Sequence, residues 1–421
     1  MLDIKFIREN RDIVAAAAKK KHVAFKVDDL IALDDKRKDL LGAVEKRRAE
    51  QNAANAKVVG AASPEERAKL IAEMKTVKVA VEKDEETLKG VMKDWQDLML
   101  RVPNVPDMSV PDGDSDADNK EVKVWGDKTA FGFEPKDHVK LMTTLGMVDF
   151  ERGAKVHGFR GYFLTGEGVR LCFAIWNFAL DFFSKKGFSP VMPPVIVRKL
   201  TMYGTGYLPD GEEDLYKTQD GDYLVGTAEV PLMGMFAEET LNAAELPKKY
   251  LGFSACYRRE AGAHSKDVKG LIRVHEFHKF EQLVLCEANH ETSVKLHEEL
   301  NHNTEEFIEA LGIPYHTVIN CGADLGLGQV KKYDVELWVP KEGKYREIGS
   351  ASYFHDFQCR RLNIRYRDAE GTLRYAHSLN ATAIPTPRIL VSLVENYQQA
   401  DGSVRIPDIL KKYFGKDAIT K

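Results

Sequence analysis

The sequence predicts an α+β protein in which an antiparallel hairpin of two long helices precedes a domain with an antiparallel sheet flanked by helices. The first hundred residues are rich in alanine, lysine and glutamate, and only one proline and three glycines occur between Asp28 and Leu100. Apolar residues recur at heptad spacing from Leu70 to Leu98. Later strand-like runs follow one another without helical segments between them, which favours antiparallel pairing. The predicted boundaries are 1–102 for a helical arm, 103–119 for a linker and 120–421 for a globular domain.

The hairpin has its turn at residues 60–66. Gly60 can end the first helix, and Ser63 can cap the second, with Pro64 at its first position and Glu66 three residues after the cap. Helices of about 33 residues would each be roughly 50 Å long. The heptad seam of the second helix is interrupted once, by Asp84. Its members are Leu70, Met74, Val77, Val81, Asp84, Leu88, Val91, Trp95 and Leu98.

The first helix of the hairpin carries two groups of three basic side chains, for which the sequence leaves two interpretations open. Cations at helical spacing can follow the phosphates of a nucleic acid. Alternatively, they form a solvated face that is balanced by the neighbouring carboxylates. The cations are Lys36, Arg37, Lys38, Lys46, Arg47 and Arg48, and the carboxylates are Asp34, Asp35, Asp39 and Glu45.

Composition restricts the class of protein. Among 421 residues the net charge is −4, so a contact with nucleic acid has to come from a local basic surface. The N-terminus is too charged for a signal peptide, and the apolar stretch Leu171–Phe183 contains Asn177 and Asp181, so we expect no membrane span. The five cysteines lie at least 30 residues apart, which argues against a thiolate zinc site or a disulfide scaffold and indicates a reducing, cytoplasmic location.

The segment from Val102 to Asn119 contains three prolines and five aspartates, which predicts an extended, solvated linker. Beyond it, the sequence contains both helical patterns and strand-like runs. The predicted helices are Gly168–Lys185, Asn289–Leu311 and Pro387–Gln398. The predicted strands are Tyr223–Gly226, Tyr250–Cys256, Val274–Leu285, Tyr333–Val339 and Tyr353–Phe357.

The stretch from Tyr250 to Gln282 has the features of a triphosphate site. Arg258, Arg259 and Glu260 follow the first predicted strand, and guanidinium groups match phosphate oxygens. A loop with Gly262, Lys266, Lys269 and Gly270 comes next. Phe277 could stack on a purine, and Glu281, four residues further along the strand, shares its face. The alternative is an ordinary hairpin with charged rims.

Three further segments carry candidate ligands. Thr227 and Glu229 could seat a small polar molecule, with the carboxylate holding an ammonium, although a helix capping box would explain them as well. Glu347 and Ser350 offer the oxygen atoms that Mg²⁺ takes alongside phosphate, or form an exposed strand edge. Arg388, in the first turn of a predicted helix, combines with the helix dipole to form an anion site.

In the order and spacing of these segments, the sequence resembles the seryl-tRNA synthetases of the bacterial type over essentially its full length. Lys186–Pro194 resembles motif 1 of class II synthetases, which implies a homodimer interface. Arg258–Glu281 resembles motif 2, and Asn380–Arg388 with its helix resembles motif 3. Thr227-Ala228-Glu229 matches the serine-site triplet of the family. The helical hairpin resembles the arm that grips serine tRNA, which implies a nucleic-acid role for its six cations.

The resemblance implies a role for each matching residue. Arg258, Arg388 and Glu347 would be the catalytic residues: Arg258 would hold the α-phosphate and the serine carboxylate, and Arg388 the γ-phosphate. Phe277 would stack on adenine, while Glu347 and Ser350 would hold Mg²⁺. The other implied ATP contacts are Arg259, Glu260, Val274, Ile348 and Gly349. The implied serine site is Thr227, Ala228, Glu229, Glu281, Asn380 and Thr382, in which Glu281 and Thr382 read the hydroxyl group.

The resemblance also implies the reaction: ATP-dependent formation of seryl-adenylate, then transfer of serine to serine tRNA and to selenocysteine tRNA. No zinc is expected, because Glu281 and Thr382 fit the metal-free type of serine site. The sequence departs from the common pattern at Ala383 and Pro387, where glycines are frequent, and at Gly349, where serine is frequent. We expect altered loop packing there. Two alternatives are an adenylating ligase that loads a carrier protein and a non-catalytic coiled-coil scaffold.

Overall fold

The computed structural model describes residues 1–261 and 269–421, so the predicted loop residues Gly262 and Lys266 lie outside the described part. The chain divides into two compact units. One comprises residues 2–19 and 23–103, and is called the arm unit. The other comprises Met1, residues 20–22 and residues 104–421, and is called the sheet unit.

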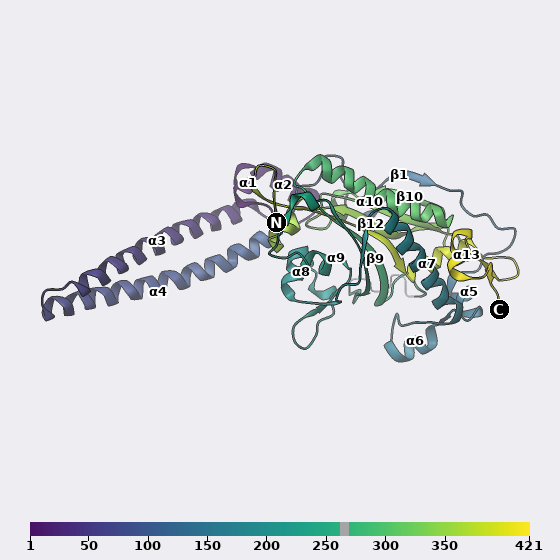
Figure 1. The fold of residues 1–421 in the computed structure, drawn as a ribbon, viewed down its shortest axis with the longest axis horizontal. Helices are drawn as coiled ribbons and strands as arrows, with labels where there is room; N and C mark the ends of the chain where they lie inside the picture. Colours follow the sequence, from purple (N-terminus) through teal and green to yellow (C-terminus); the bar gives the residue numbers. More distant parts are fainter. Residues whose placement is uncertain (262–268) are drawn as a thin grey trace. The chain divides into compact units, whose positions relative to one another are not determined.

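The arm unit is helical, and α3 and α4 lie side by side as an antiparallel hairpin (Figure 1). Ser63 caps α4: its side chain accepts a hydrogen bond from the backbone N–H of Glu66 at 3.1 Å, and Pro64 opens the helix. Val81 and Val91 are buried in the seam between the helices, which confirms the predicted heptad contact. The helices are α1 (Ile4–Glu9), α2 (Arg11–Lys20), α3 (Val27–Val59) and α4 (Pro64–Leu100).

Several of the arm cations stabilise the hairpin itself. Arg47 pairs across the seam with Asp84 at 2.9 Å, which explains the single polar residue in the heptad series. Arg48 pairs with Glu85 at 2.6 Å. Arg37 and Lys38 both bind the buried carboxylate of Asp34, and the Arg37 guanidinium lies 4.7 Å from the centre of the Trp95 ring. Lys36 and Lys46 are exposed. The interpretation as balanced charges therefore holds for Arg37, Lys38, Arg47 and Arg48, and a contact of Lys36 and Lys46 with nucleic acid stays a prediction.

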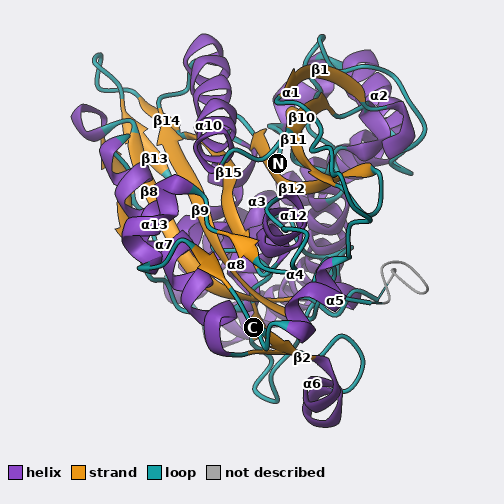
Figure 2. Ribbon diagram, turned by 90° about the vertical axis from the view of Figure 1, so that its right-hand side faces the viewer, coloured by secondary structure: helices purple, strands orange, loops and turns teal. Residues whose placement is uncertain are grey.

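The sheet unit is built on eight strands in the order β1-β10-β11-β12-β15-β9-β8-β4 (Figure 2). Neighbours are antiparallel except β4 and β8, which are parallel. The α+β prediction is confirmed. The strands are β1 (Lys120–Trp125), β10 (Tyr315–Ile319), β11 (Lys331–Val339), β12 (Lys344–Tyr353), β15 (His377–Thr386), β9 (Glu276–Cys286), β8 (Lys248–Tyr257) and β4 (Ser189–Val191).

Smaller elements surround this sheet. The helices are α5 (His138–Thr144), α6 (Phe150–His157), α7 (Gly166–Lys185), α8 (Lys199–Thr205), α9 (Glu229–Gly234), α10 (His290–Leu311), α11 (Phe357–Leu362), α12 (Arg388–Asn396) and α13 (Asp408–Phe414). The short strands are β2 (Val148–Asp149), β3 (Phe163–Leu164), β5 (Ile196–Val197), β6 (Tyr223–Leu224), β7 (Thr240–Asn242), β13 (Arg365–Arg367), β14 (Leu373–Tyr375), β16 (Val404–Arg405) and β17 (Ala418–Ile419).

The main core lies where α7 and α10 meet the sheet. Phe178 of α7 stacks on Phe307 of α10 with ring centres 4.8 Å apart, and Phe183 packs on the same ring at 5.6 Å. Phe280 of β9 is buried in the same cluster. Burying such aromatic side chains fixes the sheet as a rigid platform, and the candidate site stands on this platform.

Two sequence predictions are wrong in detail. The strand predicted at Tyr353–Phe357 is the end of β12 followed by a turn, and α11 begins at Phe357. The small and proline-rich residues before Arg388 form β15, a central strand buried along its whole length, rather than a loop that opens a helix. The helix predicted at Pro387–Gln398 is α12, which spans Arg388–Asn396, so Arg388 lies in its first turn as predicted.

The linker is less solvated than its composition predicts. The backbone N–H of Asn104 donates to the carbonyl of Leu327 at 2.9 Å, and that of Asp107 donates to the carbonyl of Val330 at 2.9 Å. Val110 is buried. The segment 104–110 is thus part of the sheet unit, because these backbone groups find partners there rather than in water. Asp112 and Asp114 remain exposed.

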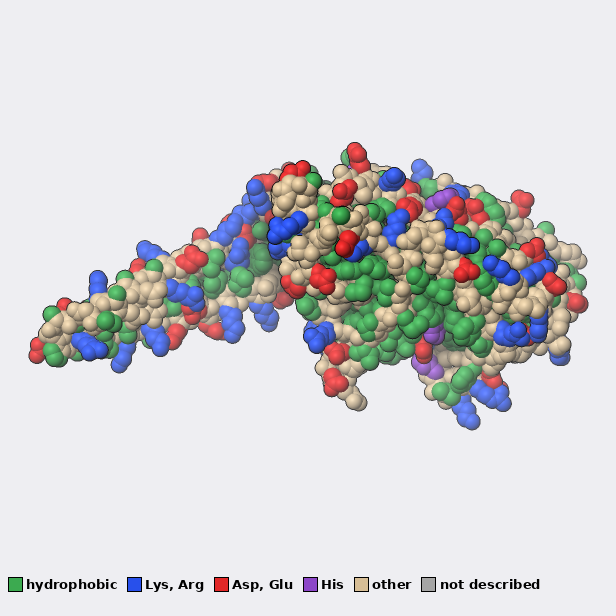
Figure 3. All heavy atoms as spheres, viewed as in Figure 1, with side chains coloured by type: hydrophobic (Ala, Val, Ile, Leu, Met, Phe, Trp, Pro, Cys, Tyr) green, Lys and Arg blue, Asp and Glu red, His purple; other side chains and the backbone are tan. Residues whose placement is uncertain are grey.

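The surface of the sheet unit shows hydrophobic side chains gathered on the face that Figure 3 presents. Large exposed hydrophobic residues of this unit include Phe173 of α7, Met192, which follows β4, and Leu200 of α8. Within the described ranges, every helix is too short or too polar to cross a lipid bilayer.

Candidate active site

A pocket of about 310 Å³ lies in the sheet unit, lined by residues of β9, β12 and β15 and by the segments 205–207, 326–329 and 385–388. Fourteen of the predicted site residues line it. They are Thr227, Glu229, Arg258, Glu260, Val274, Phe277, Glu281, Glu347, Ile348, Gly349, Ser350, Asn380, Thr382 and Arg388. Segments more than 160 residues apart in the chain therefore converge on one cavity.

Strand β9 presents three alternating side chains to the pocket: Phe277, Lys279 and Glu281. The register between β8 and β9 is unbroken over these residues, so they share one face, as predicted for Phe277 and Glu281. Lys279 was missed, although the same alternation passes through it. Its ammonium donates to the Thr227 hydroxyl at 2.8 Å and forms an ion pair with Glu281, so a buried cation neutralises the carboxylate of the predicted serine site.

Glu229, at the start of α9, is a buried carboxylate held by two partners that the sequence did not reveal. The Gln358 amide donates to its Oε1 at 2.7 Å, and the Tyr207 hydroxyl donates to its Oε2 at 3.2 Å. Only 4% of Glu229 is exposed, and burial raises the pKa of its carboxyl group to about 7. A cationic ligand would favour the ionised form.

A β-bulge explains how Glu347 and Ser350 reach the same pocket. Three residues apart on a regular strand, they would face opposite sides. In the pairing of β11 with β12, Val335 lies opposite Gly349 and Glu336 lies opposite Glu347, so Ile348 is an extra residue. The extra residue reverses the alternation, and both oxygen-bearing side chains face the cavity.

A second bulge occurs in β15. Thr382 lies opposite Glu281 and Ile384 lies opposite Phe280, so Ala383 is the extra residue, and it is buried. Gly349 packs against this strand: a Cβ atom there would lie 2.6 Å from the Cβ of Thr382. The glycine at 349 therefore leaves room for the threonine at 382, which gives a packing reason for this departure from the family pattern.

Arg388 and Arg258 enter the pocket from different elements. At the start of α12, Arg388 donates through Nε to the carbonyl of Ile272 and through Nη1 to the carbonyl of Glu347, both at 2.9 Å. Burial lowers the pKa of the Arg388 guanidinium below its ordinary value. The Arg258 guanidinium lies 5.3 Å from the centre of the Phe277 ring. Two fixed cations beside an aromatic ring can bind an anionic nucleotide.

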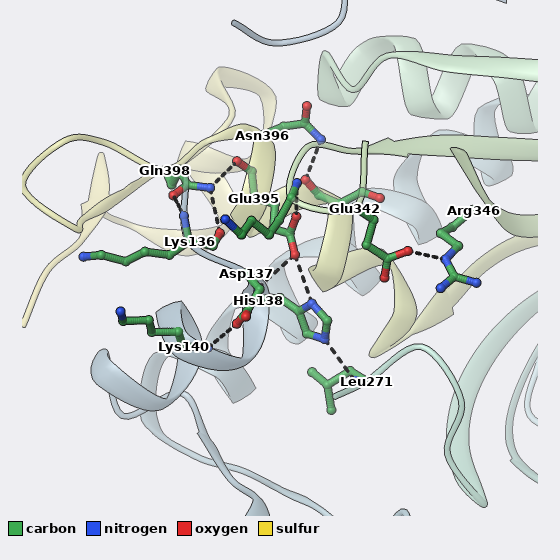
Figure 4. Close-up of polar contacts among 12 residues, drawn as sticks. Lys136, Asp137, His138, Lys140, Leu271, Glu342, Arg346, Glu395, Asn396 and Gln398 are labelled. Carbon is green, nitrogen blue, oxygen red and sulfur yellow. Dashed lines mark hydrogen bonds and ion pairs between the residues drawn. The ribbon is translucent and has the colours of Figure 1, made fainter. Parts of the chain in front are cut away.

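The Ile272 carbonyl that binds Arg388 belongs to a segment that a buried histidine contacts through the preceding residue, Leu271. Figure 4 shows His138 of α5 between Glu395 and Leu271. The Glu395 carboxylate lies 3.0 Å from His138 Nδ1, and the backbone N–H of Leu271 donates to Nε2 at 3.3 Å. Nδ1 therefore carries the proton, and a neutral imidazole bridges α12 to the residue before Ile272.

Two predicted site residues lie outside the pocket lining in the described part of the chain. Arg259 donates from its backbone N–H to the carbonyl of Asp214 at 2.9 Å and from its guanidinium to the carbonyl of Glu213 at 3.1 Å. Ala228 is fully buried. The described residues contain no cluster of three or more His, Cys, Asp or Glu side chains arranged to hold a metal ion.

Comparison with known proteins identifies the family. Residues 1–106 match the seryl-tRNA synthetase N-terminal domain, and residues 216–397 match the tRNA synthetase class II core domain for G, H, P, S and T. A serine–tRNA ligase of Deinococcus radiodurans is 47% identical over 99% of this chain and 98% of its own length.

Two solved structures are similar over the whole chain. The seryl-tRNA synthetase of Pyrococcus horikoshii, complexed with ATP, is 39% identical with a TM-score of 0.90, and the alignment covers 100% of this chain and 99% of that one. The cytoplasmic serine–tRNA ligase of Naegleria fowleri, in complex with AMP, is 32% identical with a TM-score of 0.86 at the same coverage. On these relationships, the chain belongs to the seryl-tRNA synthetase family.

Proposed function

We propose that the pocket binds ATP and L-serine side by side and joins them as seryl-adenylate. As a member of its family, the chain is an ATP-dependent ligase that activates L-serine and transfers it to the 3′ end of serine tRNA. The observation that carries the assignment of the site is the convergence of fourteen predicted residues on one cavity.

The serine end of the pocket is formed by Glu229, Thr227, Glu281, Asn380 and Thr382. The Glu229 carboxylate holds the serine ammonium group. Glu281 and Thr382, which lie opposite each other on β9 and β15, read the side-chain hydroxyl. Alanine would leave these buried polar groups without a partner, so the site rejects it strongly.

The nucleotide end is formed by Arg258, Phe277 and Arg388. Phe277 stacks on adenine, Arg258 binds the α-phosphate together with the serine carboxylate, and Arg388 binds the γ-phosphate. Glu347 and Ser350, brought to one face by the bulge at Ile348, fit the oxygen ligands that Mg²⁺ prefers and would hold it. Bound there, the ion would supply neutralisation of phosphate charge.

The chemistry requires positioning rather than an enzyme nucleophile. In the first step a serine carboxylate oxygen forms a bond to the α-phosphorus, the bond from that phosphorus to the bridging oxygen breaks, and pyrophosphate leaves. In the second step a ribose hydroxyl of the terminal tRNA adenosine attacks the seryl carbonyl carbon, and AMP leaves. Arg258 is fixed beside the reacting phosphorus and neutralises the charge that develops on its oxygens.

Each of the two units has a further proposed partner: tRNA for the arm unit and a second copy of the chain for the sheet unit. The exposed cations of the arm unit, such as Lys36 and Lys46, contact the phosphates of serine tRNA, and selenocysteine tRNA binds the same surface. Motif 1, at the sheet edge formed by β4, makes a homodimer interface. All five cysteines are free and buried, which supports a reducing, cytoplasmic location.

The test is amino-acid-dependent exchange of pyrophosphate into ATP with each of the twenty amino acids. We expect exchange with serine and at least about a hundredfold less with alanine. Exchange with another amino acid, or with none, would overturn the proposal. A carrier-protein ligase would transfer serine to phosphopantetheine in preference to tRNA; the match of residues 1–106 to the synthetase N-terminal domain argues against it. A scaffold would not bind ATP.

A further inference from the structure

One wall of the pocket is a loop, Gly326–Gln329, to which the site predictions assign no role. It packs against the serine end. Gln329 donates from its side chain to the Ser352 hydroxyl at 2.8 Å, and Ser352 lies opposite Asn380 in the pairing of β12 with β15. A Cβ atom at Gly328 would come within 2.7 Å of the Phe357 ring, next in the chain to Gln358, which holds Glu229. A shift of this loop would therefore disturb the groups that surround serine.

The loop is held in place by a buried lysine from the N-terminal segment. Lys21 is 4% exposed, and its ammonium donates to the carbonyls of Gly326 at 3.1 Å, Leu327 at 3.0 Å and Gln329 at 2.5 Å. Its three N–H donors are matched to three acceptors more than 300 residues away in the sequence. A buried ammonium is costly unless it is bonded in this way, so an arrangement of this kind fixes the backbone of the loop.

A second residue holds the same loop from another part of the chain. The Asn104 side-chain amide donates to the carbonyls of Gly328 at 3.0 Å and Phe354 at 2.8 Å, and its backbone N–H donates to Leu327. Asn104 is buried. Lys21 comes six residues before the start of α3 and Asn104 four residues after the end of α4, so the two segments that bracket the helical hairpin in the sequence meet at one loop of the pocket.

We propose that Lys21 and Asn104 are positioning residues for serine binding: they hold the Gly326–Gln329 loop in the form that completes the serine end of the pocket. This inference rests on the proposed function of the pocket. It makes amino-acid recognition depend on residues outside the class II core match, which begins at residue 216. The nucleotide end, where Arg258, Phe277 and Arg388 lie, does not depend on these contacts.

The experiment compares two neighbouring lysines. Lys21→Met keeps the aliphatic stem and removes the three donors. Lys20→Met is the matched control, because Lys20 donates to the carbonyl of Val110 and pairs with Asp112 rather than with the pocket loop. The KM values for serine and for ATP are measured by pyrophosphate exchange with the full chain. In Lys21→Met three carbonyls of the loop lose the ammonium, and two of them, those of Gly326 and Leu327, retain a backbone N–H donor. We therefore expect the KM for serine to rise at least about tenfold while the KM for ATP changes less than about twofold. In Lys20→Met neither changes.

Asn104→Leu is the second probe of the same loop, with the same expected split between the two KM values. It carries the test if Lys21→Met does not fold. If Lys21→Met folds, Lys21→Gln, which retains two donors on a shorter stem, should show a KM for serine between those of the wild type and Lys21→Met. An unchanged KM for serine in variants that fold, or an equal rise of both KM values, would overturn the inference. A wild-type chain that fails to exchange with serine would instead refute the proposed function, so the two failures are distinguishable.

Discussion

Glu229→Gln tests the proposed contact between the Glu229 carboxylate and the serine ammonium group, with little change in the shape of the side chain. In the substituted side chain, the amide oxygen can still accept the hydrogen bond from Gln358, and the amide nitrogen can donate to the Tyr207 oxygen, so both neighbours keep a partner. What is lost is the negative charge that faces the serine ammonium. A hydrogen bond to a charged group contributes about 1.5–3 kcal/mol. We therefore expect the KM for serine to rise between about tenfold and a hundredfold, with the KM for ATP nearly unchanged.

The pH dependence gives this prediction a second readout. Burial raises the pKa of Glu229 to about 7, above its ordinary 4.5. The wild-type kcat/KM for serine should fall as pH drops below about 7, because the protonated carboxyl group no longer holds the ammonium. The variant should lack this decrease. The raised pKa also means that the folded state loses stability as pH rises from 4.5 through 7, a loss that the glutamine escapes, so the variant should be no less stable at pH 8.

Pyrophosphate exchange at a series of pH values from 5.5 to 8.5, with serine and ATP varied separately, measures both readouts. Thermal unfolding at pH 8 verifies that the variant is folded. A glutamine variant with the wild-type KM for serine, or one that retains the decrease below pH 7, would show that Glu229 does not hold the ammonium group and that the assignment of the serine end is wrong.

Three other predictions address the rest of the site. Gly349→Ser places a Cβ atom 2.6 Å from that of Thr382 and should lower kcat/KM for serine by about tenfold or more. The control is Gly90→Ala, in open space on α4, which should leave kcat/KM for serine unchanged. Equal kinetics in both variants would contradict the packing argument. Arg388→Ala removes a guanidinium fixed by two carbonyls and should reduce exchange by about a hundredfold or more; near-normal exchange would exclude a role in activation. Removing residues 36–98 should spare serine activation and abolish tRNA charging, and equal charging by the shortened chain would refute the role of the arm.

The sequence by itself determined the arm in detail. The heptad seam, the Ser63 cap and the break at Asp84 all depend on local spacing, which a helix converts directly into position. It also identified fourteen of the residues that line the pocket, because their motifs lie on short continuous segments. The alternation along β9 placed Phe277 and Glu281 on one face for the same reason.

Only the tertiary structure decided which of these residues meet and what holds them. The two bulges at Ile348 and Ala383 reverse the strand alternation. The local sequence does not predict where one of two paired strands will contain an extra residue. Strand β15 was missed because its small residues and Pro385 are poor strand formers, and burial between β12 and β9 overrides that preference. Lys21 and Gln358 resemble ordinary polar residues in the sequence. They gain their roles because folding places them against buried partners far away in the chain, where a donor without an acceptor would be costly.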